Sequence, residues 1–228
     1  MKKDITELFY HVDEFASGLE KEGARYQLSK NSDSRSPTRV PGLSMGEIMM
    51  IMLMFQESPC RNFKYFYKSY MTLYRPEFPN MPSYERFVAL MPRAFIFLAV
   101  LLYSLLSPGQ GIGYIDATSL AICHPKRISQ NKVFKGLAAL GKTTKGWFFG
   151  FKLHVITDEK GNLLRVKLTK GNMDDRQVVP QMTKGLLGLL FGDKGYISAK
   201  LFLRLYQRGL KLVTGLKKTM KNKVMLWH

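Results

Sequence analysis

The chain has 228 residues, 46% of them hydrophobic and 23% charged, a composition typical of globular proteins with a buried core. Its two cysteines, Cys60 and Cys123, lie far apart without a CxxC motif, which argues against a disulfide framework or a zinc ribbon and favours a reducing compartment. The formal net charge of +18 favours an anionic polymer as the binding partner.

The positive charge is concentrated in the second half of the chain. Residues 1–108 contain 13 Lys and Arg against 11 Asp and Glu, a net of +2, whereas residues 109–228 contain 22 against 6, a net of +16. This distribution favours nucleic acid as the partner, and a solvated basic surface is the alternative. Membrane-surface binding is disfavoured because the basic half is predicted to form strands and short helices, not one long amphipathic helix.

The first part of the chain predicts an α-helical N-terminal domain, residues 1–108, which is a candidate for DNA binding. Apolar residues at helical spacing predict a helix over residues 5–20. A polar, proline-containing linker over residues 31–42 follows. The sequence "SMGE" then predicts a capping box in which the Ser44 hydroxyl accepts from the backbone of Glu47, whose carboxylate reaches back.

Four further helical segments are predicted in this domain, and one of them is "MPSYERFVALMP", residues 81–92. The run "IMMIMLMF", residues 48–55, carries a methionine stripe that favours core packing. The aromatic segment of residues 62–74 suits either DNA contact or packing between helices. The apolar run of residues 94–106 is shorter than the roughly 20 residues that a bilayer requires, so it is expected to be a buried core helix.

After a turn-rich boundary at residues 107–111, the pattern changes to alternating strands and helices. Hydrophobic runs separated by turn residues predict the order β-β-β-α-β-α-β. The strands are expected at residues 112–120, 147–157, 163–169, 187–193 and 210–216, with helices starting near residues 174 and 198. This order predicts an α/β layer architecture for residues 109–228.

Two carboxylates stand out in this α/β region. Asp116 interrupts an apolar strand, and Asp193 follows directly after another. Buried carboxylates are costly unless they are paired or bound to a cation, and two acids on neighbouring strands can share Mg²⁺, which prefers oxygen ligands. The alternative is structural, with Asp116 bonded to the backbone at a strand end and Asp193 in a turn.

The connection from His124 to Gly146 is long for a link between two strands, which favours a functional or disordered loop. It contains no acid, and phosphate contacts from its cations would position DNA without reading its sequence. A flexible, solvated loop is the alternative. The cations are Lys126, Arg127, Lys132, Lys135, Lys142 and Lys145.

Three stretches in order carry a resemblance to a known family: "YIDATSLAICHPKRISQNKVFKGLAALGKTTKGWFFGFKLHVI", "LTKGNMDDR" and "FGDKGYIS". They resemble the insertion-sequence DDE transposases, closest to the insertion-sequence 982 family. The resemblance covers about 110 residues, from Tyr114 to about Lys223, and the helical N-terminal domain looks like the same family's N-terminal region. It implies an RNase H-like catalytic core in residues 109–228.

The resemblance also implies roles for individual residues. Asp116, in "YIDAT", matches the first catalytic acid, and Asp193, in "GDKGYI", matches the second. Both are therefore expected to bind Mg²⁺ or Mn²⁺ in a two-metal site. The third acid of such enzymes is a Glu on a later helix, yet residues 194–228 contain no Asp or Glu. The catalytic domain is accordingly expected to be truncated at its C-terminus before the third acid.

Other polar residues near these motifs are candidates for supporting the site. Asp174 and Asp175 are expected mainly to cap a helix, with contact to the site residues as the alternative. His124, beside Cys123, does not make a zinc site with one cysteine and is expected at a strand end or near a phosphate. Lys194 adjoins Asp193 and is a further supporting candidate.

Three functional hypotheses remain open at this point. The first is a transposase that carries out Mg²⁺-dependent strand cleavage and strand transfer on double-stranded DNA, as a homo-oligomer in the bacterial cytoplasm and without membrane attachment. The second is a catalytically inactive DNA-binding remnant or an inhibitor of transposition. The third is a globular protein with a basic surface and no nucleic-acid partner.

Overall fold

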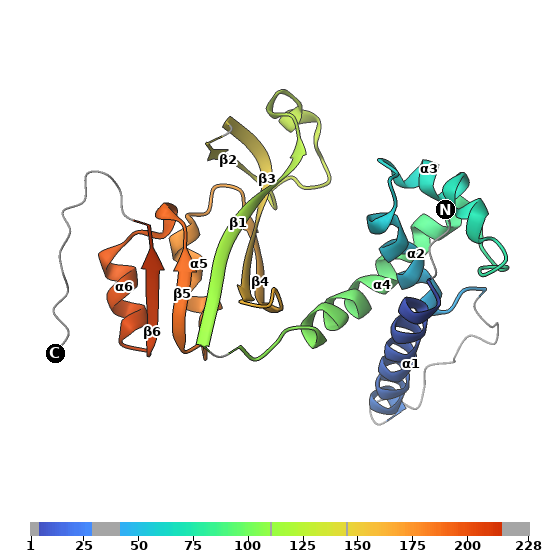
Figure 1. Cartoon of the computed structure of the whole chain (residues 1–228). Helices are drawn as coiled ribbons and strands as arrows, with labels where there is room; N and C mark the ends of the chain where they lie inside the picture. Colours follow the sequence, from blue (N-terminus) through green and yellow to red (C-terminus); the bar gives the residue numbers. More distant parts are fainter. Residues whose placement is uncertain (1–4, 29–41, 110, 145, 216–228) are drawn as a thin grey trace. The chain divides into compact units, whose positions relative to one another are not determined.

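The computed structural model of the chain describes residues 5–28, 42–109, 111–144 and 146–215. The chain divides into two compact units, Met1–Ser104 and Leu105–His228 (Figure 1). The division falls a few residues before the boundary expected from the sequence. Of the expected linker only Gly42 is among the described residues, and the tail of residues 216–228 lies outside them.

The first unit is helical, as the sequence predicted. The helices are α1 (Thr6–Leu28), α2 (Met45–Glu57), α3 (Phe63–Lys68), the 3₁₀ helix η1 (Tyr70–Tyr74) and α4 (Tyr84–Ser104). The capping box at the start of α2 is confirmed. The Glu47 backbone N–H donates to the Ser44 hydroxyl at 3.0 Å, and the Ser44 N–H donates to the Glu47 carboxylate at 2.7 Å.

The core of this unit is built from the methionine stripe and the aromatic segment. Met49 and Met50 of α2 are fully buried and pack with Phe66 of α3 and Phe87 of α4. The prediction that the methionines serve core packing is therefore confirmed. Part of the aromatic segment is packed in the same way, because Tyr67 is buried and donates a hydrogen bond to the Pro82 carbonyl at 2.9 Å.

The expectation of a buried helix over residues 94–106 is wrong. These residues belong to the second half of α4, where Phe95, Ile96 and Tyr103 are 72%, 67% and 77% exposed. Phe87 and Ala94 are buried in the core, and after Ala94 only one side of the helix, with Phe97, Leu98 and Leu101, still packs against it. By length and composition alone α4 is also long and apolar enough to cross a membrane, but one such helix, anchored in a helical core, is weak evidence for that.

The second unit is a mixed sheet with two helices. Its elements are β1 (Gly111–Cys123), the 3₁₀ helix η2 (Pro125–Gln130), β2 (Ala139–Thr143), β3 (Gly146–Asp158), β4 (Leu163–Lys170), α5 (Asp175–Met182), β5 (Gly188–Gly192), the 3₁₀ helix η3 (Lys194–Tyr196), α6 (Ala199–Tyr206) and β6 (Leu210–Thr214). The strand order is β2-β3-β1-β5-β6, and β4 pairs with β3 on the same edge as β2. β1, β5 and β6 are parallel, and β3 is antiparallel to β1.

The strand β2 is an element that the sequence analysis did not predict. It lies within the long connection after β1 and pairs with the first residues of β3. Three glycines make this crowded corner possible. A Cβ on Gly150 would lie 1.9 Å from the Leu120 carbonyl oxygen, and one on Gly141 would lie 2.1 Å from the Gly171 carbonyl oxygen. The connection is therefore structured over η2 and β2, not an irregular loop throughout.

The sheet has one covered face and one open face. Ile115, Ile156 and Leu190 are buried in one core with residues of α5 and α6, which both lie on this covered face (Figure 1). The open face is the side of the sheet that carries the alternate residues. On it Tyr114 is 47% exposed and Leu168 is 53% exposed. Alternation of this kind is expected when only one side of a sheet is packed.

Candidate active site

Asp116 lies within β1 on the open face. It follows the buried Ile115 in the strand, and its side chain is exposed. Its carboxylate Oδ1 accepts the backbone N–H of Ala117 at 2.8 Å. Within the described residues no cation forms an ion pair with Asp116. The carboxylate is thus held on a rigid strand and left free to bind a ligand.

Asp193 follows β5 at the position that matches Asp116. The parallel pairing of β1 with β5 ends at Ile115 opposite Gly192, so Asp116 and Asp193 are the next residues on the two strands. The backbone at Asp193 stays extended, with φ −71° and ψ 177°. The exposed carboxylate caps η3 by accepting the Gly195 N–H at 2.8 Å. Asp193 therefore stands at the carboxyl end of β5, and Asp116 lies beside it, within the longer strand β1.

A pair of stacked rings precedes the two acids. Tyr114 and Phe191 are paired across β1 and β5, with ring centroids 5.5 Å apart and an interplanar angle of 23°. Side chains two residues apart in a strand share a face, so Asp116 and Asp193 follow these rings on the open face. The rings fix the register of the two strands and with it the relative placement of the acids.

The donor set formed by Asp116 and Asp193 suits a hard divalent cation. Both groups are exposed carboxylates without an ion-pair partner among the described residues, and oxygen ligands of this kind are what Mg²⁺ prefers. The set is small, however. Over the described part of the chain, no group of three or more His, Cys, Asp and Glu side chains is arranged to hold a metal ion.

Tyr196 lies beneath the turn that carries Asp193. It is 2% exposed, and its ring packs so closely that a Cβ on Gly192 would lie 3.0 Å from it. Burial raises the pKa of the Tyr196 phenol well above its usual range. Nearby carboxylates raise it further, in the order Asp175, Asp116 and Asp193. The phenol oxygen has no hydrogen-bond partner among the described residues, so a buried polar atom faces three negative charges.

A second polar group on the covered face centres on Asp175, the first residue of α5. Its carboxylate accepts the Lys152 ammonium at 2.9 Å, and the same ammonium donates to the Met173 carbonyl at 2.9 Å. The fully buried His154 lies beside this pair, with its Nδ1 3.9 Å from the Asp175 carboxylate. The Lys152 cation neutralises Asp175, which therefore serves as an anchor for α5 and not as a free ligand.

His154 of β3 is fully buried. Its Nε2 is 2.8 Å from the Thr169 hydroxyl, whereas its Nδ1 has no hydrogen-bond partner among the described residues. Burial lowers the pKa of the imidazole, Asp175 opposes that shift, and the Lys152 and Lys167 cations add to it. The ring is therefore neutral at physiological pH.

The other supporting candidates have mainly local structural roles. Asp174 caps α5 by accepting the Arg176 N–H at 2.9 Å, and the Arg176 guanidinium lowers the pKa of this carboxyl by hydrogen bonding to it. His124 caps η2, with its Nδ1 accepting the Lys126 N–H at 3.3 Å. Lys194 is exposed on η3 beside Asp193. Helix capping by Asp174 was predicted from the sequence and is confirmed.

The described cations of the connection between β1 and β3 are exposed to solvent. Lys145 lies outside the described residues, and the Lys142 ammonium sits 5.5 Å from the centre of the Trp147 ring. The connection holds no acid to neutralise its cations. Five of the predicted DNA-contacting residues are exposed: Lys126, Arg127, Lys132, Lys135 and Lys142.

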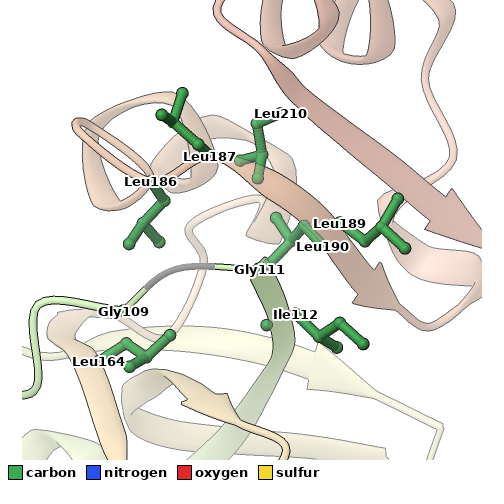
Figure 2. A pocket seen from close by; sticks show the side chains of 10 residues that line it. Gly109, Gly111, Ile112, Leu164, Leu186, Leu187, Leu189, Leu190 and Leu210 are labelled. Carbon is green, nitrogen blue, oxygen red and sulfur yellow. The ribbon is translucent and has the colours of Figure 1, made fainter.

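A small gap at the other end of the sheet is not a functional site. Figure 2 shows this gap at the amino ends of β1 and β5, between Leu164, Leu186 and Leu210. Its volume is about 10 Å³, close to the minimum for one water molecule. Its lining is made of glycines, leucines and one isoleucine, which offer no polar side chain to hold a ligand.

Sequence reasoning missed Tyr196 and Lys152 as parts of the site's surroundings. A signal was present for Lys152, because it lies two residues before His154 in β3. The two side chains therefore share the side of the strand that faces the core. Tyr196 gave no such signal, since an aromatic residue three positions after Asp193 is ordinary in a turn. Only the packed structure shows its phenol near the acids.

Comparison with known proteins identifies a family for the second unit. Residues 107–228 match the family model described as "Transposase DDE domain". One solved structure with a similar fold is the cryo-EM structure of the piggyBac transposase synaptic complex with hairpin DNA, at a TM-score of 0.50 and 11% sequence identity. The similarity covers 95% of this chain and 50% of that one, so the chain spans half the length of that transposase. No curated protein matches the sequence.

Proposed function

We propose that this chain, which belongs to the transposase DDE domain family, uses Asp116 and Asp193 to cleave and join DNA strands in transposition. The observation that carries the proposal is the register of the sheet, which sets Asp116 of β1 beside Asp193 at the carboxyl end of β5. Functional groups gather at such edges in open α/β sheets. The element order also supports an RNase H-like core, and the sequence motifs around Asp116 and Asp193 support a relation to the insertion-sequence 982 family.

The reaction comprises two phosphoryl transfers. In the first, water attacks a phosphodiester at an element end, the bond from phosphorus to the 3′ oxygen breaks, and a free 3′-hydroxyl and a 5′-phosphate result. In the second, that 3′-hydroxyl loses its proton and attacks a phosphodiester of the target, whose own 3′ oxygen departs. One bond to phosphorus forms and one breaks in each step, so the second needs no external energy source.

The two acids would hold Mg²⁺ or Mn²⁺ at this site. A pair of such ions, when bound, stabilises the attacking and leaving oxygens of an in-line displacement. The protein's own part is positional. β1 and the turn after β5 fix the two carboxylates, and the Tyr114–Phe191 ring stack keeps the strands in register. The exposed cations of residues 126–142 would contact phosphates and orient the duplex.

The third acid is proposed to come from polypeptide outside these 228 residues. Residues 194–228 contain no Asp or Glu, and Asp175 is neutralised by Lys152 at 2.9 Å. The open face supports this proposal, because Tyr114 and Leu168 leave apolar surface exposed on the face that carries Asp116. A helix packed on that face would bury this surface and bring its own side chains beside the two acids.

A second candidate function follows from the same observation. With two acids and no third, the chain would bind DNA without cutting it, as a catalytically inactive product or an inhibitor of transposition. The absence of a three-residue metal cluster among the described residues favours this reading for the chain by itself. In either case duplex DNA is the proposed partner, with assembly into a homo-oligomer on it.

A plasmid-nicking assay in Mg²⁺ or Mn²⁺ tests the proposal. The chain alone should not nick supercoiled DNA. Adding a polypeptide that supplies the third acid, fused or separate, should restore nicking to the chain but not to its Asp116→Asn variant. Nicking by the unsupplemented chain that Asp116→Asn abolishes would show that two acids suffice or that another copy donates the third. Nicking that persists in Asp116→Asn would contradict the assignment.

A further inference from the structure

The groove between α5 and α6 is a further basic surface of the second unit, separate from the cations of the β1–β3 connection. It has a volume of about 300 Å³, roughly the size of the smallest ligand sites in proteins. Its charged lining comes from both helices, through Arg176 in the first turn of α5, Lys200 in the first turn of α6 and Arg204 one turn later on α6. Against these three cations stands one acid, Asp174, which leaves a net charge of +2 in the groove.

The charges of this groove are only partly compensated. Asp174 is engaged by Arg176, whose guanidinium donates to the carboxylate through Nε at 3.0 Å and Nη2 at 2.5 Å. Lys200 and Arg204 are exposed and form no ion pair or hydrogen bond within the described residues. Two free cations one helical turn apart therefore face the groove. Concentrating like charges in this way is unfavourable for the isolated fold and favourable for an anionic ligand.

The amphipathic character of α6 explains how these cations are presented. Leu201 and Leu205 are buried in the core of the unit, which fixes the orientation of the helix about its axis. Lys200 and Arg204 then lie on the side of α6 that lines the groove. No acid from this part of the chain can neutralise them, because residues 194–228 contain none.

The groove opens at the same edge of the sheet as the two acids. β4 is antiparallel to β3, which is antiparallel to β1, so β4, β1 and β5 all point the same way. α5 follows β4, and α6 follows the turn that begins at Asp193. The first turns of both helices thus start from the edge that Asp193 follows, and DNA bound at the acids on the open face can pass around this edge to the groove on the covered side.

We propose that the α5–α6 groove binds the phosphate backbone of duplex DNA through Lys200 and Arg204. The inference rests on the proposed function, since it takes DNA as the partner. It adds a contact surface on the covered side of the sheet, distinct from the cations of residues 126–145. Arg176 remains hydrogen-bonded to Asp174 and lines the groove, whereas the two unpaired cations of α6 neutralise phosphates. These contacts position the duplex without reading its sequence.

The test is the salt dependence of DNA binding, measured by fluorescence anisotropy with a labelled synthetic duplex in EDTA. The Lys200→Ala/Arg204→Ala variant is compared with Lys160→Ala/Lys184→Ala, which removes the same charge from exposed positions away from the groove. All four side chains are exposed, so both variants should fold, as circular dichroism can verify. The assay contains no divalent cation and so is independent of the metal site.

The groove variant should bind more weakly, and its slope of log K against log salt should fall by about 2, close to 1 for each lost phosphate contact. The control should keep a slope near that of the unmodified chain. Lys200→Arg/Arg204→Lys should also retain the slope, because it keeps both charges. Equal slopes for the groove variant and the control would overturn the inference alone. An unmodified chain that binds no duplex between about 50 and 200 mM salt would overturn the proposed function with it.

Discussion

Asp116 and Asp193 are the residues that directly follow Ile115 and Gly192, the last pair between the parallel strands β1 and β5. Both carboxylates are exposed. Without a cation, two such charges repel each other. The fold tolerates this because each carboxylate accepts a local backbone N–H, from Ala117 and Gly195 respectively. This arrangement is what a cation-binding pair requires, and it makes a prediction about stability in the absence of metal.

Asp193→Asn should be no less stable than the unmodified chain in a chelator, because it removes the repulsion and keeps an oxygen that can accept the Gly195 N–H. Asp193→Ala should lose that cap and be destabilised by about 0.5–2 kcal/mol, the usual cost of losing a capping side chain. Urea denaturation in EDTA measures both. A large loss of stability in Asp193→Asn would show that the charge itself is structural.

The close packing of Gly192 under the site makes a second prediction. A Cβ there would lie 3.0 Å from the Tyr196 ring and 3.1 Å from Ile115 Cγ2. Gly192→Ala should therefore destabilise the second unit by about 1–3 kcal/mol, as overpacking does. Gly113→Ala is the control on the neighbouring strand, where the nearest side-chain atoms are at an ordinary 3.4 Å. Equal stabilities of the two variants in thermal unfolding would argue against this packing.

The pair of Lys152 and Asp175 predicts a coupled effect. Lys152 is 13% exposed and Asp175 32% exposed in their side chains, so Asp175→Asn leaves a largely buried cation without its anion. The expected loss is about 1–3 kcal/mol of unfolding free energy. Lys152→Met combined with Asp175→Asn should recover much of that loss, because replacing both partners removes the uncompensated charge. Additive effects in this double-mutant cycle would mean that the ion pair contributes little.

His154 predicts a pH dependence of stability. Burial lowers its pKa in the folded state below the usual value of 6.5, so the unfolded chain binds the proton more readily. Stability should then be constant with respect to this group above about pH 6.5 and fall as the pH decreases below that value toward the lowered pKa. His154→Gln, followed by urea denaturation at several pH values, should flatten this part of the profile. An unchanged profile would assign the dependence to other groups.

Much of this fold was predictable from the periodicity of hydrophobic residues. The elements that were predicted wrongly or missed have physical causes. Asp116 and Asp193 could be found because a carboxylate in or directly after an apolar strand is unusual. β2 was missed because its pairing depends on close backbone approach at Gly141 and Gly150, which no hydrophobic pattern reports. The exposed half of α4 was mistaken for core because apolar composition does not show where a helix runs past its neighbours.

The polar groups around the acids were less predictable. The contact between Lys152 and Asp175 joins residues 23 positions apart in the sequence, and it exists only once α5 packs on the covered face. The approach of the Tyr196 phenol to three carboxylates also depends on tertiary packing. The free cations of α6 follow a helical spacing visible in the sequence, yet the groove that they line is formed by a second helix.

The most direct test of the central claim is a Mn²⁺ titration followed by electron paramagnetic resonance, which reports metal binding without any need for a DNA substrate. The unmodified chain should bind Mn²⁺ weakly, and both Asp116→Asn and Asp193→Asn should abolish that binding. Glu159→Gln, which removes an exposed acid from the β3–β4 turn, should leave it intact. Mn²⁺ binding that survives in Asp116→Asn and Asp193→Asn would contradict the claim that these two acids form the metal site.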